Sequence, residues 1–303
     1  MDIEYLLWLQ NLREASGNFF TPLMRWASSS LPDLMFFAVI FVYWCVSKRK
    51  GIFVLFAFSL SYFYGEVMKM IFCVPRPYLK DTRITPYNSK QKDYSFPSGH
   101  SVRASSLGGG LAVISRKKAL WFSCICVILM LLVAFSRNYL GFHTPQDVLT
   151  GLLLGGVSLW LSSIVFSKPE RENIMFAVIL AVTVLCLYYL CVKSYPADIE
   201  EKELRNEIKY IFGDVGRIAG LIFGRIIERK YINFPDGLNF KRVVFAAAGL
   251  GIYSLSDSML KKSFIRFVTP FITVNGGNFL YLFLLMFFVT ALWPMVIKKF
   301  CSE

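Results

Sequence analysis

The stretch SRNYLGFHTPQDVLTGLLLGGVSLWLSSIVF, residues 136–166, joins a polar segment to a long apolar run. From Val148 onward nearly every residue is apolar or small, and about 20 such residues can cross roughly 30 Å of hydrocarbon as a helix. The start of this helix is predicted by Thr144 as the N-cap, Pro145 at the first helical position and Asp147 reaching back from the third. The stretch therefore predicts a membrane helix with a polar, histidine-containing end.

The rest of the chain has the same character. Apolar residues make up 55% of the 303 residues and charged residues only 17%, and the mean hydropathy is +0.52. A soluble protein of this length would carry a more charged surface. We therefore predict an all-α fold, a polytopic transmembrane helical bundle. Its six-helix core comprises spans near 33–47, 52–72, 97–115, 119–136, 146–167 and 173–193.

The two ends of the chain differ from this core, which covers residues 33–193. Residues 1–32 mix charged and apolar side chains, which predicts an amphipathic segment in the membrane interface rather than a cleavable signal peptide. Residues 194–303 are predicted to form a C-terminal membrane region with two or three further spans. The apolar stretches in this region are 209–227, 241–257 and 276–297. Glycines at every third or fourth position of the first stretch permit close helix packing.

The formal net charge of +13 fits a membrane protein better than a nucleic-acid-binding protein. The basic residues lie in short loops beside apolar spans, as they do on the cytoplasmic side of membrane proteins. The loops 48–51, 115–118 and 168–172 are therefore predicted to be cytoplasmic, and the connections 73–96 and 136–145 extracytoplasmic.

Three cations near the C-terminus do not follow this pattern. With nine spans in the chain, Lys261, Lys262 and Arg266 fall on the extracytoplasmic side. The positive-inside bias disfavours that placement. The sequence therefore leaves the topology of the C-terminal region open.

Polar residues gather in three segments at the predicted outer membrane edge. These segments are KMIFCVPRP (69–77), PSGH (97–100) and SRNYLGFHTPQD (136–147). The chain contains only two histidines, His100 and His143, and both lie in these segments. Imidazoles that share a membrane edge with cations and a carboxylate predict a catalytic site.

The first segment ends the second span. Lys69 has an ordinary interpretation there, because a lysine at the end of a span can extend its ammonium to the interface. Arg76 differs, because Pro75 and Pro77 stiffen the backbone around it. A guanidinium held in place offers a fixed fork of donors for two phosphate oxygens.

The second segment begins the third span. Pro97 fits the first turn of a helix, which would leave the backbone amides of Ser98, Gly99 and His100 unpaired at the positive helix end. Gly99 also lets the backbone approach a ligand closely. The alternative is a capped helix start with a histidine at the interface, and this segment alone does not separate the two.

In the third segment, His143 precedes Asp147 by four residues. The carboxylate has an ordinary role as a helix cap. It can also accept the proton of one imidazole nitrogen of His143, which leaves the other nitrogen free to attack. Arg137 supplies a further cation for phosphoryl oxygens.

Together the three segments resemble the signature of the type 2 phosphatidic acid phosphatase superfamily. The matching positions are Lys69, Arg76, Pro77, Pro97, Ser98, Gly99, His100, Ser136, Arg137, His143 and Asp147. The resemblance covers roughly residues 52–167. It implies a phosphatase core in which His143 attacks phosphorus, Asp147 orients it and His100 protonates the leaving oxygen. It also implies that the phosphoryl group is held without a metal or other cofactor by Lys69, Arg76, Ser98, Gly99 and Arg137.

The resemblance implies as substrate a lipid phosphate or lipid pyrophosphate, such as undecaprenyl pyrophosphate or phosphatidate, hydrolysed at the extracytoplasmic face of the cell membrane. One alternative is a phosphotransferase that passes the phosphoryl group to another acceptor, and a second is a transporter or scaffold with an inactive core. The C-terminal spans could also serve to form a homodimer. Arg103, an unusual residue for a bilayer helix, is expected either to contact the substrate or to pair with Glu66.

Overall fold

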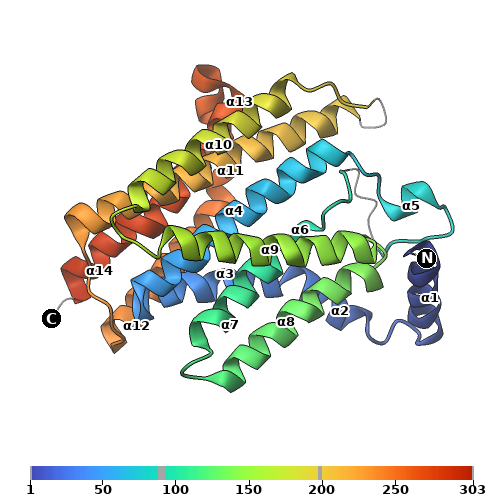
Figure 1. Cartoon of the computed structure of the whole chain (residues 1–303), viewed down its shortest axis with the longest axis horizontal. Helices are drawn as coiled ribbons and strands as arrows, with labels where there is room; N and C mark the ends of the chain where they lie inside the picture. The colour runs from blue at the N-terminus through green and yellow to red at the C-terminus, as the bar shows by residue number, and fades with distance from the viewer. Residues whose placement is uncertain (1, 88–92, 197–199, 302–303) are drawn as a thin grey trace. The chain divides into compact units, whose positions relative to one another are not determined.

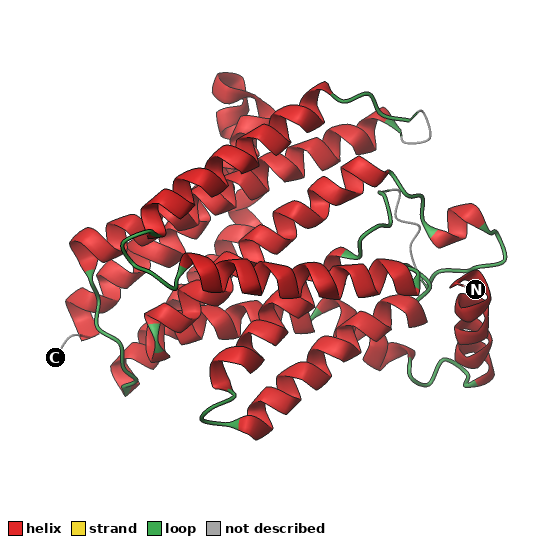
Figure 2. Ribbon diagram, viewed as in Figure 1, coloured by secondary structure: helices red, strands yellow, loops and turns green. Residues whose placement is uncertain are grey.

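The computed structural model describes residues 2–87, 93–196 and 200–301. Within these ranges every regular element is a helix and no strand occurs (Figure 2). Figure 1 shows long helices joined by short loops. The predicted all-α fold is therefore confirmed.

The helices are, in chain order, α1 (Asp2–Ala15), α2 (Thr21–Ser29), α3 (Leu31–Phe41), α4 (Lys48–Phe72), α5 (Pro77–Lys80), α6 (Gly99–Ala104), α7 (Gly110–Ser115), α8 (Leu120–Tyr139), α9 (Pro145–Val165), α10 (Glu172–Val192), α11 (Glu201–Ile227), α12 (Phe240–Leu255), α13 (Lys261–Phe287) and α14 (Trp293–Cys301). Five wider π-helical turns continue some of these helices. They are η1 (Val42–Val46), η2 (Ser105–Gly109), η3 (Glu228–Ile232), η4 (Ser256–Leu260) and η5 (Phe288–Leu292).

Six helical stretches in the described part of the chain are long and apolar enough to cross a membrane, as expected of a multi-pass membrane protein. They are Thr21–Val46, Lys48–Lys80, Leu120–Tyr139, Pro145–Val165, Glu172–Val192 and Phe240–Cys301. Five of these coincide with predicted core spans. The first begins earlier than the predicted residue 33, because α2 runs into α3 with only Ser30 between them.

The predicted third span, 97–115, has a different form. Residues 99–115 are helical throughout, but the π-helical turn η2 interrupts the α-helix between α6 and α7. A helix of this length is near the lower limit for crossing the hydrocarbon. It is not among the six stretches named above.

The predicted C-terminal stretches are also helical. The stretch 209–227 lies within α11, and 241–257 and 276–297 lie within the helical region from α12 to α14. This region reverses at Ile272 and Thr273, whose backbone is not helical. The reversal divides α13 into two helical segments.

The helices form two compact units. The first contains residues 1–36, 60–161 and 193–205, and the second contains residues 37–59, 162–192 and 206–303. The predicted division into residues 1–32, 33–193 and 194–303 follows membrane segments instead and stays a prediction. Residues 197–199, near its second boundary, lie outside the described residues.

The first unit has an apolar cluster that includes residues of the loop before α9. Its buried members are Leu6, Met24, Tyr78, Ile84, Tyr139, Leu140 and Phe142. These residues come from α1, α2, the region around α5 and the end of α8. Arg13 reinforces the attachment of α1, because its guanidinium donates to the carbonyl oxygens of Tyr139 and Thr85. The N-terminal helix thus supports the loop that carries His143.

The second unit packs α11 tightly against the second half of α13. A Cβ added at Gly216 or Gly220 would collide with the carbonyl groups of Phe279 and Phe283, respectively. Only glycine permits so close an approach of two helices. The close packing predicted from the glycine spacing is therefore confirmed.

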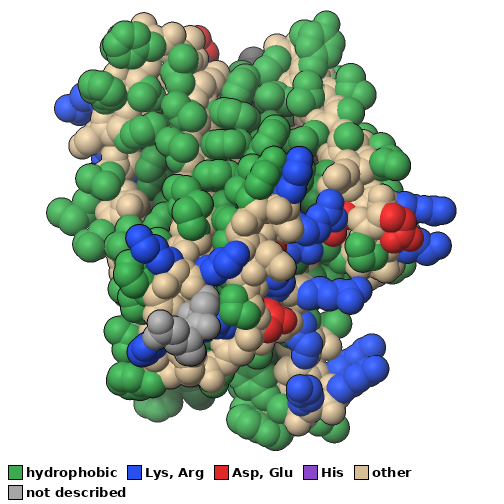
Figure 3. Space-filling view, turned by 90° about the vertical axis from the view of Figure 1, so that its left-hand side faces the viewer, with side chains coloured by type: hydrophobic (Ala, Val, Ile, Leu, Met, Phe, Trp, Pro, Cys, Tyr) green, Lys and Arg blue, Asp and Glu red, His purple; other side chains and the backbone are tan. Residues whose placement is uncertain are grey.

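The second unit also contains a buried ionic network where α4 and α10 begin and α11 ends. Lys48 pairs with Glu228, and Arg225 pairs with both Glu228 and Glu172. Arg229 adds a further ion pair to Glu172. Figure 3 views the side on which the C-terminus lies, and there Lys and Arg side chains gather among apolar ones. Such a distribution is typical of the cytoplasmic end of a membrane protein.

Candidate active site

His143 lies in the first unit, in the loop between α8 and α9. Gly141, with a φ of 74°, allows the tight turn that leads into it. The amide of Asn138 donates to the carbonyl oxygen of His143 at 2.8 Å, and Arg76 Nη1 donates to that of Phe142 at 3.1 Å. These two bonds fix the backbone on both sides of the imidazole.

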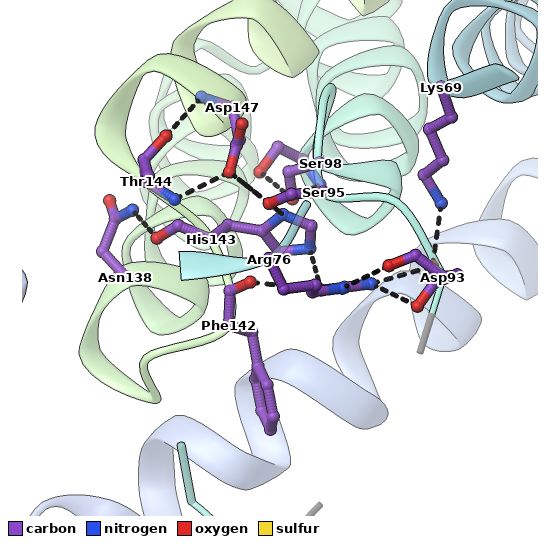
Figure 4. Close-up of polar contacts among 11 residues, drawn as sticks. Lys69, Arg76, Asp93, Ser95, Ser98, Asn138, Phe142, His143, Thr144 and Asp147 are labelled. Carbon is purple, nitrogen blue, oxygen red and sulfur yellow. Dashed lines mark hydrogen bonds and ion pairs between the residues drawn. The ribbon is translucent and has the colours of Figure 1, made fainter. Parts of the chain in front are cut away.

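Both nitrogens of the His143 ring have polar neighbours (Figure 4). Nε2 lies 3.0 Å from Arg76 Nη1, and Nδ1 lies 3.3 Å from Ser95 Oγ. Because a guanidinium can only donate, Nε2 must accept and therefore carries a lone pair. The ring proton then belongs on Nδ1, facing Ser95, whose own hydroxyl donates to Asp147 Oδ2 at 2.6 Å. These partners select the tautomer that a nucleophilic Nε2 requires.

Asp147 has two roles in this arrangement. The backbone amide of Thr144 donates to Asp147 Oδ2 at 2.8 Å, and the amide of Asp147 donates to Thr144 Oγ1 at 3.3 Å. The predicted helix cap is therefore confirmed. The same Oδ2 lies 3.5 Å from His143 Nδ1, which is long for a hydrogen bond. Asp147 thus acts on His143 mainly through the hydroxyl of Ser95.

Arg76 and Lys69 converge on one carboxylate, that of Asp93. Arg76 Nη2 lies 2.7 and 2.8 Å from the two Asp93 oxygens, and Lys69 Nζ lies 3.4 Å from one of them. Lys69 also pairs with Glu66 at 3.2 Å. The sequence predicts that Arg76 and Lys69 bind phosphate. In the structure the carboxylate of Asp93 occupies this place, and like a phosphoryl group it offers paired anionic oxygens.

Arg137 is 4% exposed and is incompletely paired. Its Nη1 donates to Ser28 Oγ at 2.6 Å, and its guanidinium lies 4.6 Å from the ring centre of Phe142. Its Nε and Nη2 are buried without a hydrogen-bond partner. A buried charged donor without a partner is costly, so these two groups indicate a place where an anion binds.

The start of α6 differs from the prediction in two respects. Pro97 precedes the helix instead of lying in its first turn, because Ser98 is the N-cap and α6 begins at Gly99. The backbone amide of Ser98 donates to the carbonyl oxygen of Asp147 at 2.9 Å, so the prediction that this amide is unpaired is wrong. The Ser98 hydroxyl caps α6 and accepts from Ser101 Oγ at 3.0 Å, which leaves its own proton available. A Cβ added at Gly99 would lie 3.7 Å from Lys69 Nζ, so the helix start and this cation are neighbours.

His100 and Arg103 lie one turn apart on α6. The charges of Arg137, Arg103 and Lys69, together with the ring of His143, act on the His100 imidazole. The two histidines therefore share one electrostatic environment.

The guanidinium of Arg103 pairs with a residue that the sequence analysis did not name. Its Nη2 donates to Asp33 at 2.6 Å, so the predicted pairing with Glu66 is wrong. Glu66 is engaged instead by Lys69, one turn away on its own helix. Contact of Arg103 with the substrate stays a prediction.

Two titratable groups in the loops of the site, Asp93 and His143, have shifted pKa values. Burial alone would raise the pKa of the Asp93 carboxyl, but the charges of Lys69 and Arg76 outweigh it and lower that pKa to about 2. Burial, followed by the charges of Arg76, Arg137 and Lys69, holds the pKa of His143 well below 6.5. His143 is thus a neutral base at neutral pH.

A pocket of about 550 Å³ lies beside Asp147 and Thr144. Its lining mixes apolar side chains with polar and charged ones. The residues that line it are Asp2, Ile3, Phe72, Val74, Lys80, Phe96, Thr144, Gln146 and Asp147. An amphiphilic molecule could place its apolar part here.

Sequence reasoning missed Ser95, Asp93 and Asn138. Asn138 lies inside the third segment and Ser95 two residues before the second, so closeness to the motifs was a usable signal for both. Asp93 carries no such signal. Among the residues that the structure describes, no group of three or more His, Cys, Asp or Glu side chains is arranged to hold a metal ion.

The chain is similar to proteins named as phosphatases and to one named as a transport permease. An undecaprenyl-diphosphatase of Sulfolobus acidocaldarius is 34% identical over 116 residues, or 38% of this chain and 53% of that protein. The bacitracin transport permease protein BcrC of Bacillus licheniformis is 30% identical over 39% of this chain and 58% of that protein. A dihydrosphingosine 1-phosphate phosphatase of Schizosaccharomyces pombe is 27% identical over 70% of this chain and 55% of that protein.

The matched regions span about half the length of these relatives. No solved structure matches the chain. The model of the PAP2 superfamily matches residues 50–171, which include all three polar segments. The chain therefore contains a PAP2 superfamily domain at residues 50–171.

Proposed function

We propose that this protein is a membrane lipid phosphatase that hydrolyses a phosphate monoester or pyrophosphate through a phosphohistidine at His143. One observation carries the proposal: a neutral imidazole, whose Nε2 carries a lone pair and accepts from Arg76, lies among the three buried cations Lys69, Arg76 and Arg137. In phosphoryl transfer the protein mainly positions the reactants and neutralises charge on the equatorial oxygens. These four side chains supply both functions.

In the first step, the substrate phosphate takes the place of Asp93 between Lys69 and Arg76 and satisfies the free donors of Arg137. His143 Nε2 then attacks phosphorus. A P–N bond forms while the P–O bond to the lipid breaks, and His100 gives a proton to the leaving oxygen. The Ser98 hydroxyl donates to a phosphoryl oxygen, and Gly99 keeps the start of α6 close to it.

In the second step, water attacks the phosphohistidine. His100, now unprotonated, accepts a proton from the water as the P–N bond breaks and free phosphate forms. Asp147, acting through Ser95, keeps the proton of His143 on Nδ1 in both steps. This stabilises the imidazolium character that His143 acquires when it bonds to phosphorus.

The pocket beside Asp147 supports a lipid substrate, because the apolar side chains in its lining, Phe72, Val74 and Phe96, can contact the part of the lipid nearest the phosphate. We place the site at the extracytoplasmic membrane edge. The support is the basic character of the loops 48–51, 115–118 and 168–172, which sends the connections 73–96 and 136–145 to the other side.

The test is phosphate release by the purified full-length protein from undecaprenyl pyrophosphate, phosphatidate and sphingosine 1-phosphate, each with and without chelator. We expect phosphate release from at least one lipid, unchanged by chelator, and none above background from His143→Ala. Loss of activity in chelator that magnesium restores would contradict the metal-independent mechanism.

A phosphotransferase would use the same first step. It would be recognised by a labelled phosphoryl group that appears on an added lipid or sugar acceptor instead of as free phosphate. That outcome would overturn the hydrolase assignment but preserve the role of His143.

A further inference from the structure

A second pocket lies within the C-terminal part of the second unit, between α11 and the two segments of α13. Its volume of about 700 Å³ is within the range of pockets that hold small molecules. Its lining includes the basic residues Lys209, Lys261, Lys262 and Arg266 and the apolar residues Ile265, Pro270 and Val274. Among the described residues of its lining, none is Asp or Glu.

Three of these cations, Lys261, Lys262 and Arg266, are those that disagree with the positive-inside pattern. The ion pair nearest to them is long, with Lys261 Nζ 3.9 Å from Asp257. Lys209 donates to the neutral side chain of Asn206 at 3.1 Å. The positive charge is therefore poorly compensated, and an anionic ligand would explain why it is gathered here.

The position of these residues along the helix places them at the depth of lipid headgroups. Helix α12 begins at Phe240, and the helical path continues through η4 into α13. By Lys261 it has risen about 30 Å, which is the thickness of the hydrocarbon core. Phe267 and Phe271, 74% and 78% exposed, follow in the next turns and fit the headgroup boundary better than bulk water.

The pocket also has a polar group without a partner. Asn278, which is 1% exposed, donates from Nδ2 to the carbonyl oxygen of Lys209, but its Oδ1 has no hydrogen-bond partner. A buried acceptor of this kind is rarely left unsatisfied. A ligand headgroup that carries hydroxyl groups can supply the missing donor.

We propose that this pocket binds an anionic phospholipid of the bilayer with a hydroxylated headgroup. Lys209, Lys262 and Arg266 hold its phosphate, and the first part of an acyl chain lies against Ile265 and Val274. The bilayer is the source, because the pocket joins a phosphate-binding edge to an apolar wall. This site is separate from the residues that surround His143 and does not depend on the proposed reaction.

The test is binding of dioleoyl phosphatidylglycerol to the full-length protein in detergent, measured by native mass spectrometry. Dioleoyl phosphatidylcholine, glycerol 3-phosphate and inorganic phosphate are the comparison ligands. The variant is Lys262→Gln/Arg266→Gln, since both side chains are exposed and their loss leaves the packing intact. The matched control is Lys230→Gln/Lys299→Gln, which removes two exposed cations that do not line the pocket.

We expect phosphatidylglycerol to bind most tightly, and its affinity to fall about tenfold or more in the pocket variant but not in the control. Equal losses in both variants would show diffuse charge attraction and overturn the proposal. Binding of glycerol 3-phosphate or phosphatidylcholine as tight as that of phosphatidylglycerol would also overturn it.

A second variant tests the apolar wall without changing charge. Val274→Asn places a polar group where the acyl chain is assigned, at a side chain that is already 44% exposed. We expect a severalfold loss of phosphatidylglycerol affinity, because apolar contact is lost. Unchanged affinity would contradict the assigned chain position.

Discussion

Both compact units bury arginine side chains, but they neutralise them differently. In the second unit, Arg225 lies 3.0 Å from Glu172 and 2.7 Å from Glu228. In the first unit, Arg137 contacts Ser28 and the ring of Phe142 and leaves two donors unpaired. An unpaired buried charge costs several kcal/mol. Of these two arginines, the one with carboxylate partners has a structural role, and the one with unpaired donors indicates a site that an anion completes.

The largest expected effects are on activity, and they distinguish the roles of His143 and His100, the two histidines of the first unit. His143→Ala removes the nucleophile, so we expect activity to fall by about four orders of magnitude with every substrate. His100→Ala removes only the general acid and base. Its first step should therefore recover with p-nitrophenyl phosphate, whose leaving group needs no proton. The measurement is single-turnover release of nitrophenol beside release of the lipid alcohol.

Equal losses in His100→Ala for both leaving groups would contradict its role as the acid. Asn138→Ala is a useful third variant, because it disturbs the loop of His143 without removing either imidazole. It should affect both substrates alike.

The next effect compares the two arginines directly. Arg137→Gln should reduce kcat/KM about 10²–10³-fold, the usual effect of removing a donor to transition-state charge, and leave the melting temperature unchanged or raised. Arg225→Gln leaves Glu172 and Glu228 poorly paired, so it should lower stability by about 3–5 kcal/mol. Turnover and thermal unfolding measured on both variants check this. A stable Arg225 variant and an unstable Arg137 variant would reverse the assignment.

A smaller effect is expected at Ser95, a positioning residue that connects Asp147 to His143. Ser95→Ala should lower kcat by about 10- to 100-fold and leave KM nearly unchanged, because only the orientation of the imidazole is lost. Ser106→Ala is the matched control, since that buried hydroxyl donates only to carbonyl groups of its own helix. Equal kcat values for the two variants would show that Ser95 has no part in positioning.

The smallest effect concerns pH. Because the pKa of His143 is held well below 6.5, the acid limb of kcat/KM against pH should lie below pH 6.5. In the unfolded chain His143 binds a proton near pH 6.5, whereas in the folded protein it does not. The free energy of unfolding should therefore fall as the pH decreases through this value. The melting temperature of His143→Gln should therefore fall less between pH 7 and pH 5 than that of the unaltered protein. An acid limb above pH 6.5 would contradict a buried, neutral nucleophile.

Local chemistry made part of the site predictable. The cap formed by Thr144 and Asp147 depends on residues three positions apart, so the sequence contains it. The apolar runs that form the spans are equally local, and the helix bounds agree with most of them within a few residues. The first span and α11 begin earlier than predicted, and the third span is interrupted by η2. The glycine spacing of α11 also predicted its close packing.

Contacts between distant segments were not predictable in this way. Ser95 reaches Asp147 across 52 residues, and Arg103 reaches Asp33 across 70. The amide of Ser98 donates to the carbonyl oxygen of Asp147. No rule for the start of a helix predicts this hydrogen bond. Each of these depends on how helices pack, and a single sequence does not report that packing.

The proposed mechanism requires a covalent bond between phosphorus and His143 Nε2. Brief reaction with a ³²P-labelled lipid phosphate, followed by alkaline quenching and peptide mapping, measures that bond. The mechanism predicts acid-labile label on the peptide that contains His143 and none in His143→Ala. With ³²P-labelled p-nitrophenyl phosphate, whose first step needs no acid, it predicts that this label accumulates in His100→Ala. Label on another residue, or full turnover by His143→Ala, would contradict it.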